Sequence, residues 1–131
     1  MKESKFRFQD PYLNKLEFYI NKNYEASESE VSICNKFSVT IKKDDNKPIA
    51  SVSLDAIIGD KEAAPFYIDC EMASDFIWDG SSYDEQTIND LLSINAPSLL
   101  LGYIRPIVSQ ITNMSECPPY NIPFYNFLDE D

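Results

Sequence analysis

The sequence predicts an α+β fold in which a four-stranded antiparallel sheet with a long crossover loop is followed by a short and a long helix packed on one face. Apolar residues alternate with a period of two through the first 72 residues, as in strands with one buried face. A polar, acidic stretch at residues 21–32 separates the first strand from the others. After residue 82 the apolar spacing becomes helical.

The first strand is expected between Phe6 and Ile20, where apolar and aromatic residues occupy even positions. Pro11 cannot donate a backbone hydrogen bond and Asp10 interrupts the apolar face, so we expect a bulge or bend there on a strand that lies partly at an edge. The alternating residues are Phe6, Phe8, Tyr12, Leu16, Phe18 and Ile20.

Three further strands follow the crossover loop. The apolar residues Ile33, Phe37, Val39 and Ile41 lie on odd positions, and after a polar turn at residues 44–47 the even positions from Ala50 to Ile58 are apolar, which predicts a hairpin. A second turn at residues 59–62 leads to the last strand, with apolar residues at Phe66, Ile68, Cys70 and Met72.

Two helices are expected after the sheet. Residues 82–85 form a capping box, in which the Ser82 hydroxyl caps the first turn and Glu85 reaches back to it. A second helix is expected to begin at Pro97, because proline suits the first turn of a helix. The apolar residues of this helix form a face too broad for one neighbour: Leu100, Leu101, Ile104, Ile107, Val108 and Ile111.

The length and composition predict a single domain over residues 1–131. The formal net charge of −11 opposes binding to nucleic acid or to anionic lipid. Acidic residues favour solubility, and they also attract basic, unfolded polypeptide; both interpretations stay open. The first residues lack an apolar signal region and no run approaches a membrane span, so we expect a cytoplasmic protein without membrane insertion.

Several kinds of chemistry lack their residues in this sequence. It contains no histidine, which excludes Ser-His-Asp and Cys-His catalysis, and its three glycines are isolated, so it has no phosphate-binding loop. Cys34, Cys70 and Cys117 are too far apart in the sequence to indicate a disulfide framework or a zinc site. We therefore expect no enzyme activity, no cofactor and no bound metal.

The last third of the chain resembles the SecB family of protein-export chaperones. In that family a Cys-Pro-x-x-Leu-Phe-Pro-Tyr-x-Arg stretch begins the long helix, and a Phe-Pro-x-Leu-x-Leu-x-Pro-x-Asn-Phe stretch follows after a short turn. Phe76, after the last strand, corresponds to the family's Gly-Ile-Phe turn, and the order of elements agrees over nearly the whole chain. The motif residues in register are Pro97, Leu100, Tyr103, Arg105, Pro118, Ile122, Asn126 and Phe127.

The resemblance implies an ATP-independent holdase that keeps unfolded clients ready for export and translocation. Family members form homotetramers, as dimers of dimers, with apolar grooves for the client; a dimer is the simpler alternative here. Aromatic and apolar residues that could line such a groove include a cluster in a predicted connection after the last strand. The candidates are Phe76, Ile77, Trp78, Tyr83, Tyr103 and Tyr120, each of which could instead belong to a core or a subunit interface.

Some positions depart from the family pattern. Members that deliver clients to the SecA motor carry acidic residues where this chain has Lys15 and Tyr19, which puts binding of a SecA-type motor in doubt. Three hypotheses therefore stay open: a general holdase for export, a specialised SecB-like chaperone that protects the antitoxin of a toxin–antitoxin–chaperone system, and a non-chaperone binding domain that keeps only the fold.

Overall fold

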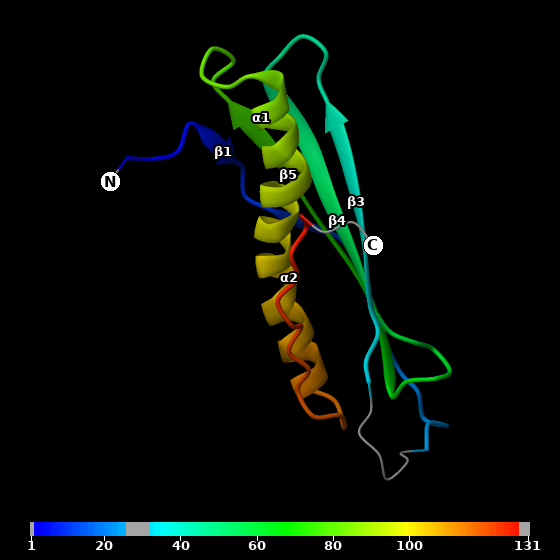
Figure 1. Ribbon diagram of the computed structural model, residues 1–131. Helices are drawn as coiled ribbons and strands as arrows, with labels where there is room; N and C mark the ends of the chain where they lie inside the picture. The colour runs from blue at the N-terminus through cyan, green and yellow to red at the C-terminus, as the bar shows by residue number, and fades with distance from the viewer. Residues whose placement is uncertain (1, 26–31, 129–131) are drawn as a thin grey trace.

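The computed structural model describes residues 2–25 and 32–128 and shows an antiparallel sheet with a helical rod lying along one face (Figure 1). The strands lie side by side in the order β1 and β2, β5, β4, β3, and the predicted α+β fold is confirmed. The elements are β1 (Phe6–Phe8), β2 (Tyr12–Ile20), β3 (Asn35–Lys43), β4 (Ile49–Gly59), β5 (Phe66–Trp78), α1 (Glu85–Asp90), a π-helical turn η1 (Leu91–Asn95) and α2 (Ala96–Asn113).

The predicted first strand is divided into β1 and β2, which both pair with β5. Phe8 lies opposite Phe76 and Tyr12 lies opposite Ala73, so β1 and β2 carry one more residue than β5 over this interval. The register shifts again between Leu13 and Lys15. The predicted irregularity at residues 10–11 is confirmed, and it follows from the missing N–H of the proline.

The connection after β2 crosses from one edge of the sheet to the other. β2 pairs with β5, whereas β3 pairs with β4, so the chain between them must pass from the first edge strand to the last. Of the predicted crossover loop at 21–32, residues 26–31 lie outside the described residues.

β5 is longer than the sequence analysis predicted. It continues past Met72 to Trp78, so the placement of Phe76 and Trp78 in a connection is wrong. Ser74 fills an inward position without exposure, and its hydroxyl donates to the Gln9 carbonyl at 2.6 Å. The inward alternation therefore runs on through a satisfied polar residue, which the apolar pattern alone did not reveal.

The first helix begins two residues later than predicted. Asp84 is the N-cap, because its Oδ1 accepts a hydrogen bond from the Thr87 amide at 2.7 Å; the predicted cap at Ser82 is wrong. Ser82 instead donates its hydroxyl to the Asp79 carboxylate at 3.0 Å.

The two predicted helices are joined into one rod. The separate start at Pro97 is wrong, because α1 continues through η1 into α2. The Ala96 amide donates to the Leu91 carbonyl five residues back, which is the bond of a π turn. Pro97 has no N–H, and its ring would collide with the carbonyl four residues earlier in a regular helix, so a wider turn just before it relieves both problems.

The core lies between α2 and the inward faces of β4 and β5. The motif residues Pro97 and Leu100 are both buried in it. Burying one large apolar side chain stabilises the fold by about 1.5–3 kcal/mol, so this layer is the main source of stability. Its fully buried members include Val52, Leu54, Ile58, Ile68, Phe76, Leu92, Leu100, Ile104 and Val108.

The helical rod Glu85–Asn113 is long and apolar enough, by length and composition, to cross a membrane. From the sequence we expect no segment of this kind, and that expectation is wrong by this criterion. Core helices pass the same test, and in this structure the apolar positions of α2 that recur at helical spacing pack on the sheet. We therefore assign the apolar character of the rod to packing.

Candidate functional site

A single helix leaves the outer parts of this sheet uncovered. An α-helix with its side chains is about 10 Å across, and neighbouring strands are about 4.8 Å apart, so one helix covers about two strands. Here α2 packs against β4 and β5 in the middle of the sheet (Figure 1). Apolar residues of the edge strands that point toward the helix side are therefore left accessible.

The first accessible surface lies beside α2 over β1 and β2, and we call it the β2-side strip: Phe8, Leu13, Leu16 and Tyr103. Leu16 lies opposite the buried Cys70, which fixes its side chain on the helix side of the sheet. The rings of Phe8 and Tyr103 meet edge to face, with centroids 6.5 Å apart. Strand and helix thus form one continuous apolar surface.

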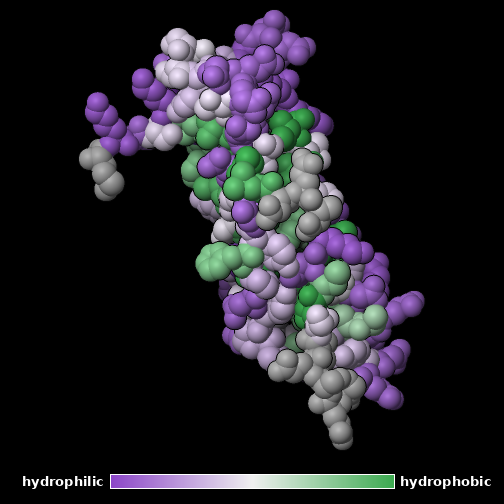
Figure 2. All heavy atoms as spheres, in the orientation of Figure 1, coloured by the Kyte–Doolittle hydropathy of each residue, from purple (hydrophilic) through white to green (hydrophobic). Residues whose placement is uncertain are grey.

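The second surface lies on the other edge, and we call it the β3-side strip: Phe37, Val39 and Ile41. Val39 and Ile41 lie opposite the buried Leu54 and Val52, so they also point toward the helix side. In both strips every member except the half-buried Phe37 is between 37% and 46% exposed. Figure 2 shows hydrophobic residues gathered on this face between largely hydrophilic ends.

The C-terminal segment, residues 117–128, covers part of the β3-side strip. It runs back alongside α2 (Figure 1) and buries Ile122. Tyr125 and Phe127 place their rings 4.8 and 6.0 Å from the ring of Phe37. Val39 and Ile41, farther along β3, remain exposed.

Polar contacts fasten this segment to the start of β3. The Asn35 side-chain amide donates to the hydroxyl oxygens of Tyr120 and Tyr125, each at 2.8 Å. Arg105 of α2 lies over the ring of Phe124, 4.3 Å from its centroid. Among the family-motif residues, Arg105 therefore helps to hold the segment that carries Pro118, Asn126 and Phe127.

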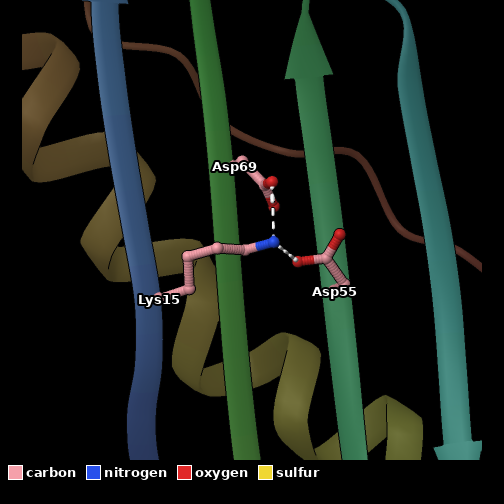
Figure 3. Close-up of polar contacts among 3 residues, drawn as sticks. All are labelled: Lys15, Asp55 and Asp69. Carbon is pink, nitrogen blue, oxygen red and sulfur yellow. Dashed lines mark ion pairs between the residues drawn. The ribbon is translucent and has the colours of Figure 1, made fainter.

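The opposite face of the sheet is polar. Lys15 of β2 reaches across β5, with its Nζ 2.9 Å from the Asp69 carboxylate and 3.5 Å from that of Asp55 on β4 (Figure 3). Nearby, Lys61 lies over the rings of Tyr19 and Tyr67. Lys15 and Tyr19 are thus both engaged by neighbours within the chain.

The two carboxylates compete for one ammonium group, and their pKa values move apart. Burial, together with the neighbouring Asp69, raises the pKa of the Asp55 carboxyl to about 6. Burial would also raise the pKa of Asp69, but hydrogen bonds from Asp55 and Lys15 outweigh it and hold that pKa below its ordinary value. Lys15, hydrogen-bonded to Asp69, has a raised pKa and stays charged.

The structure separates the six predicted site residues. Phe76 and Trp78 are in the core, where both stack on Phe6, and Ile77 is half-buried on the polar face of the sheet. Tyr83 packs against the core. Tyr103 is exposed in the β2-side strip, and Tyr120 lies in the C-terminal segment, 5.8 Å from the ring of Phe66. Their contact with a client stays a prediction.

The edge-strand residues of both strips were missed as site residues. Phe8, Leu16, Val39 and Ile41 were assigned to strands by their alternation, which made them inward positions. The sequence did contain a signal, because it predicts one long helix for four strands. One helix is too narrow to cover four strands, so some inward apolar residues on the outer strands are left accessible.

The described residues offer no alternative chemical site. Within 2–25 and 32–128, no group of three or more Cys, Asp or Glu residues could hold a metal ion. Cys34 is exposed, Cys117 is half-buried and Cys70 is buried; all three are free thiols. Burial raises the pKa of Cys70 to about 11, so this thiol is unreactive at neutral pH.

The fold is similar to that of a SecB-like chaperone. The Mycobacterium tuberculosis SecB-like chaperone Rv1957, in complex with a ChAD peptide from the antitoxin HigA1, has a TM-score of 0.74 and 15% sequence identity over 92% of this chain and 90% of that chain. A Streptococcus agalactiae protein of unknown function has a TM-score of 0.53 and 14% identity over 91% of this chain and 97% of that chain. No protein-family model and no curated protein matches the sequence. The likeness shows the fold alone.

The charge triad makes a pH-dependent prediction for Asp55→Asn. Because the pKa of Asp55 is raised in the folded state, its contribution to stability is present below its unfolded pKa, about 3.9, and is lost as the pH rises through about 6. The amide mimics the protonated form. The melting temperature of Asp55→Asn minus that of the wild type should therefore increase between pH 4.5 and 7.5.

Two other variants serve as controls for that experiment. Asp69→Asn removes the closer acceptor of Lys15 and should lower the melting temperature at pH 7.5. Asp45→Asn removes one carboxylate from an exposed turn outside the charge triad and controls for the change in net charge. A melting-temperature difference for Asp55→Asn that stays constant or decreases with pH contradicts the assigned charge arrangement.

Proposed function

We propose that this protein is an ATP-independent chaperone, a holdase that binds unfolded polypeptides along the strips that flank α2. The observation that carries the proposal is that each apolar strip lies along a strand at the edge of the sheet. Among the described residues, β2 pairs only with β5, and β3 only with β4. Extended polypeptide could therefore bury alternate side chains on a strip while its backbone bonds the adjacent edge.

The charge of the chain suits such clients. A net charge of −11 attracts basic polypeptides and speeds their encounter, while the uncharged strips supply affinity that does not depend on one client sequence. Binding by apolar contact needs neither nucleotide nor catalytic residue. The SecB-like fold supports a binding function of this kind. We propose that the protein acts in the cytoplasm and is not an enzyme.

A second hypothesis is a dedicated chaperone for one partner, such as an antitoxin. Two observations favour it over general protein export. The structural neighbour from Mycobacterium tuberculosis binds a peptide from an antitoxin. In this chain Lys15 and Tyr19, at positions where exporting family members present acidic residues to the SecA motor, are engaged in intramolecular contacts. We therefore propose polypeptide clients without a SecA-type motor.

We also propose a homo-oligomer, a tetramer as a dimer of dimers or a dimer, formed through the outer side of α2. This 18-residue helix carries one charged residue, Arg105, whereas a quarter of the whole chain is charged. Gly102 faces solvent, and a Cβ added to it would meet no atom within 4 Å. A small residue on an uncharged helix face allows the close approach of a second helix.

Client binding can be tested with matched pairs of aspartate substitutions. Leu13→Asp and Val39→Asp each place one negative charge on a strip, whereas Asn14→Asp and Thr40→Asp place the same charge on the neighbouring residue, on the polar face. The probe is a fluorescein-labelled, unstructured 20-residue peptide with alternating apolar and basic residues. The strip variants should weaken binding at least about tenfold, the cost of about 1.4 kcal/mol, and the paired controls should not.

The same titration separates the hypotheses. Equal weakening by strip and control variants would place the client elsewhere. No binding of this peptide by the wild type at micromolar concentration would exclude a general holdase and leave a dedicated partner or a non-chaperone domain with this fold. Circular dichroism of each variant checks that the fold is intact.

The proposed oligomer interface predicts different effects for two substitutions of Gly102. Gly102→Ala removes the conformational cost of a helical glycine and should stabilise an isolated chain by about 0.5–1 kcal/mol. Gly102→Glu adds bulk and charge and should shift the mass measured by light scattering from the oligomer to a smaller species, with an unchanged helical spectrum. Thr40→Asp should leave the mass unchanged. An oligomer that tolerates Gly102→Glu would contradict the proposed interface.

A further inference from the structure

The C-terminal segment lies on the chaperone surface in the manner expected of an extended client. Its residues form neither helix nor strand, and alternate side chains contact the rest of the chain. Tyr120 and Ile122 pack on the core, whereas Tyr125 and Phe127 contact the ring of Phe37 and Tyr125 stays 40% exposed. Pro123 and Phe124 separate the two pairs, and Phe124 is 92% exposed. The segment therefore occupies the β3-side strip by side-chain contacts.

The backbone of this segment is held weakly. Within the described residues, no backbone–backbone hydrogen bond joins residues 117–128 to the rest of the chain. Its backbone is hydrogen-bonded to α2 through the Tyr120 amide, which donates to the Thr112 hydroxyl at 2.8 Å. Ile122, 5% exposed, is the one buried residue of the segment, so few interactions oppose its release.

One side chain ties together the two halves of the segment. Asn35, the first residue of β3, donates to Tyr120 before Pro123 and Phe124 and to Tyr125 after them. Phe37, two residues farther along β3, receives the rings of Tyr125 and Phe127. The contacts end there, and the strip continues uncovered through Val39 and Ile41.

We propose that the C-terminal segment is a displaceable intramolecular occupant of the β3-side strip, latched by Asn35, and that a client gains the full strip only when the segment is released. This inference rests on the proposed holdase function and adds a regulatory step to it. The β2-side strip has no such occupant among the described residues, so the two strips differ in accessibility. Tyr120 is then a competitor of the client and not part of its binding site.

The latch sets the apparent affinity of the β3-side strip. If the strip is free in only a fraction of molecules, the apparent Kd is the intrinsic Kd divided by that fraction. Tyr120→Phe with Tyr125→Phe removes both hydroxyl acceptors and keeps both rings in place. Loss of two hydrogen bonds should raise the released fraction by about 5- to 150-fold and tighten client binding by up to that factor.

The test titrates the labelled 20-residue peptide against the wild type and the Tyr120→Phe/Tyr125→Phe variant. Tyr19→Phe/Tyr67→Phe is the matched control, because its two hydroxyls lie on the polar face of the sheet. We expect tighter binding for the latch variant alone. The gain should persist when Leu13→Asp is added, because Leu13 lies in the β2-side strip and the β3-side strip is left unchanged as a binding surface. The gain should vanish when Val39→Asp is added, because Val39 lies in the β3-side strip itself. NMR relaxation dispersion of residues 117–128 should report a larger released population.

The outcomes separate the two proposals. Unchanged or weaker binding by the latch variant, with a wild type that binds the peptide, overturns the displaceable occupant and leaves the holdase function standing. Failure of both proteins to bind overturns the holdase function and the regulatory step that depends on it. A gain that survives Val39→Asp also overturns the inference, because the released surface would then not be the β3-side strip.

Discussion

The width of one helix beside a sheet four strands wide is the constraint on which this structure depends. α2 seals β4 and β5, where the inward residues of both strands are fully buried. The inward positions on the edge strands are covered only in part, so Leu16 and Val39 remain accessible although their strand partners are buried. The exposed apolar area therefore results from the architecture and is not a set of scattered surface residues.

The two sides of the sheet that flank α2 differ in how far they are covered. On the β3 side, residues 117–128 return along α2 and cover Phe37, fastened through Asn35 and Arg105. On the β2 side, Phe8 and Tyr103 meet without any such cover among the described residues. The opposite face of the sheet is polar, and Lys15 pairs there with Asp69 and Asp55. The sheet thus has one polar face and one apolar face.

Most of the sheet could be predicted from the sequence, because the period-two alternation and Pro11 determine the strands and the break between β1 and β2. The end of β5 could not, since Ser74 is a polar residue at an inward position, where its hydroxyl donates to the carbonyl of the distant Gln9. The join of the helices could not either, since Pro97 is compatible with both a helix start and a π turn. The candidate site was harder to predict. Exposure of Leu13 or Val39 depends on which strands the helix covers, and no local sequence pattern encodes that tertiary contact.

Photo-crosslinking from adjacent residues tests the central claim most directly. A photoreactive phenylalanine analogue is placed singly at Leu16 or Val39, on the helix side, and at Glu17 or Thr40, on the polar face of the same strands. The protein is then irradiated with an unfolded polypeptide. The account predicts crosslinks from positions 16 and 39 that exceed those from 17 and 40. Equal crosslinking from both faces, or more from the polar face, would contradict the assignment of client binding to the strips beside α2.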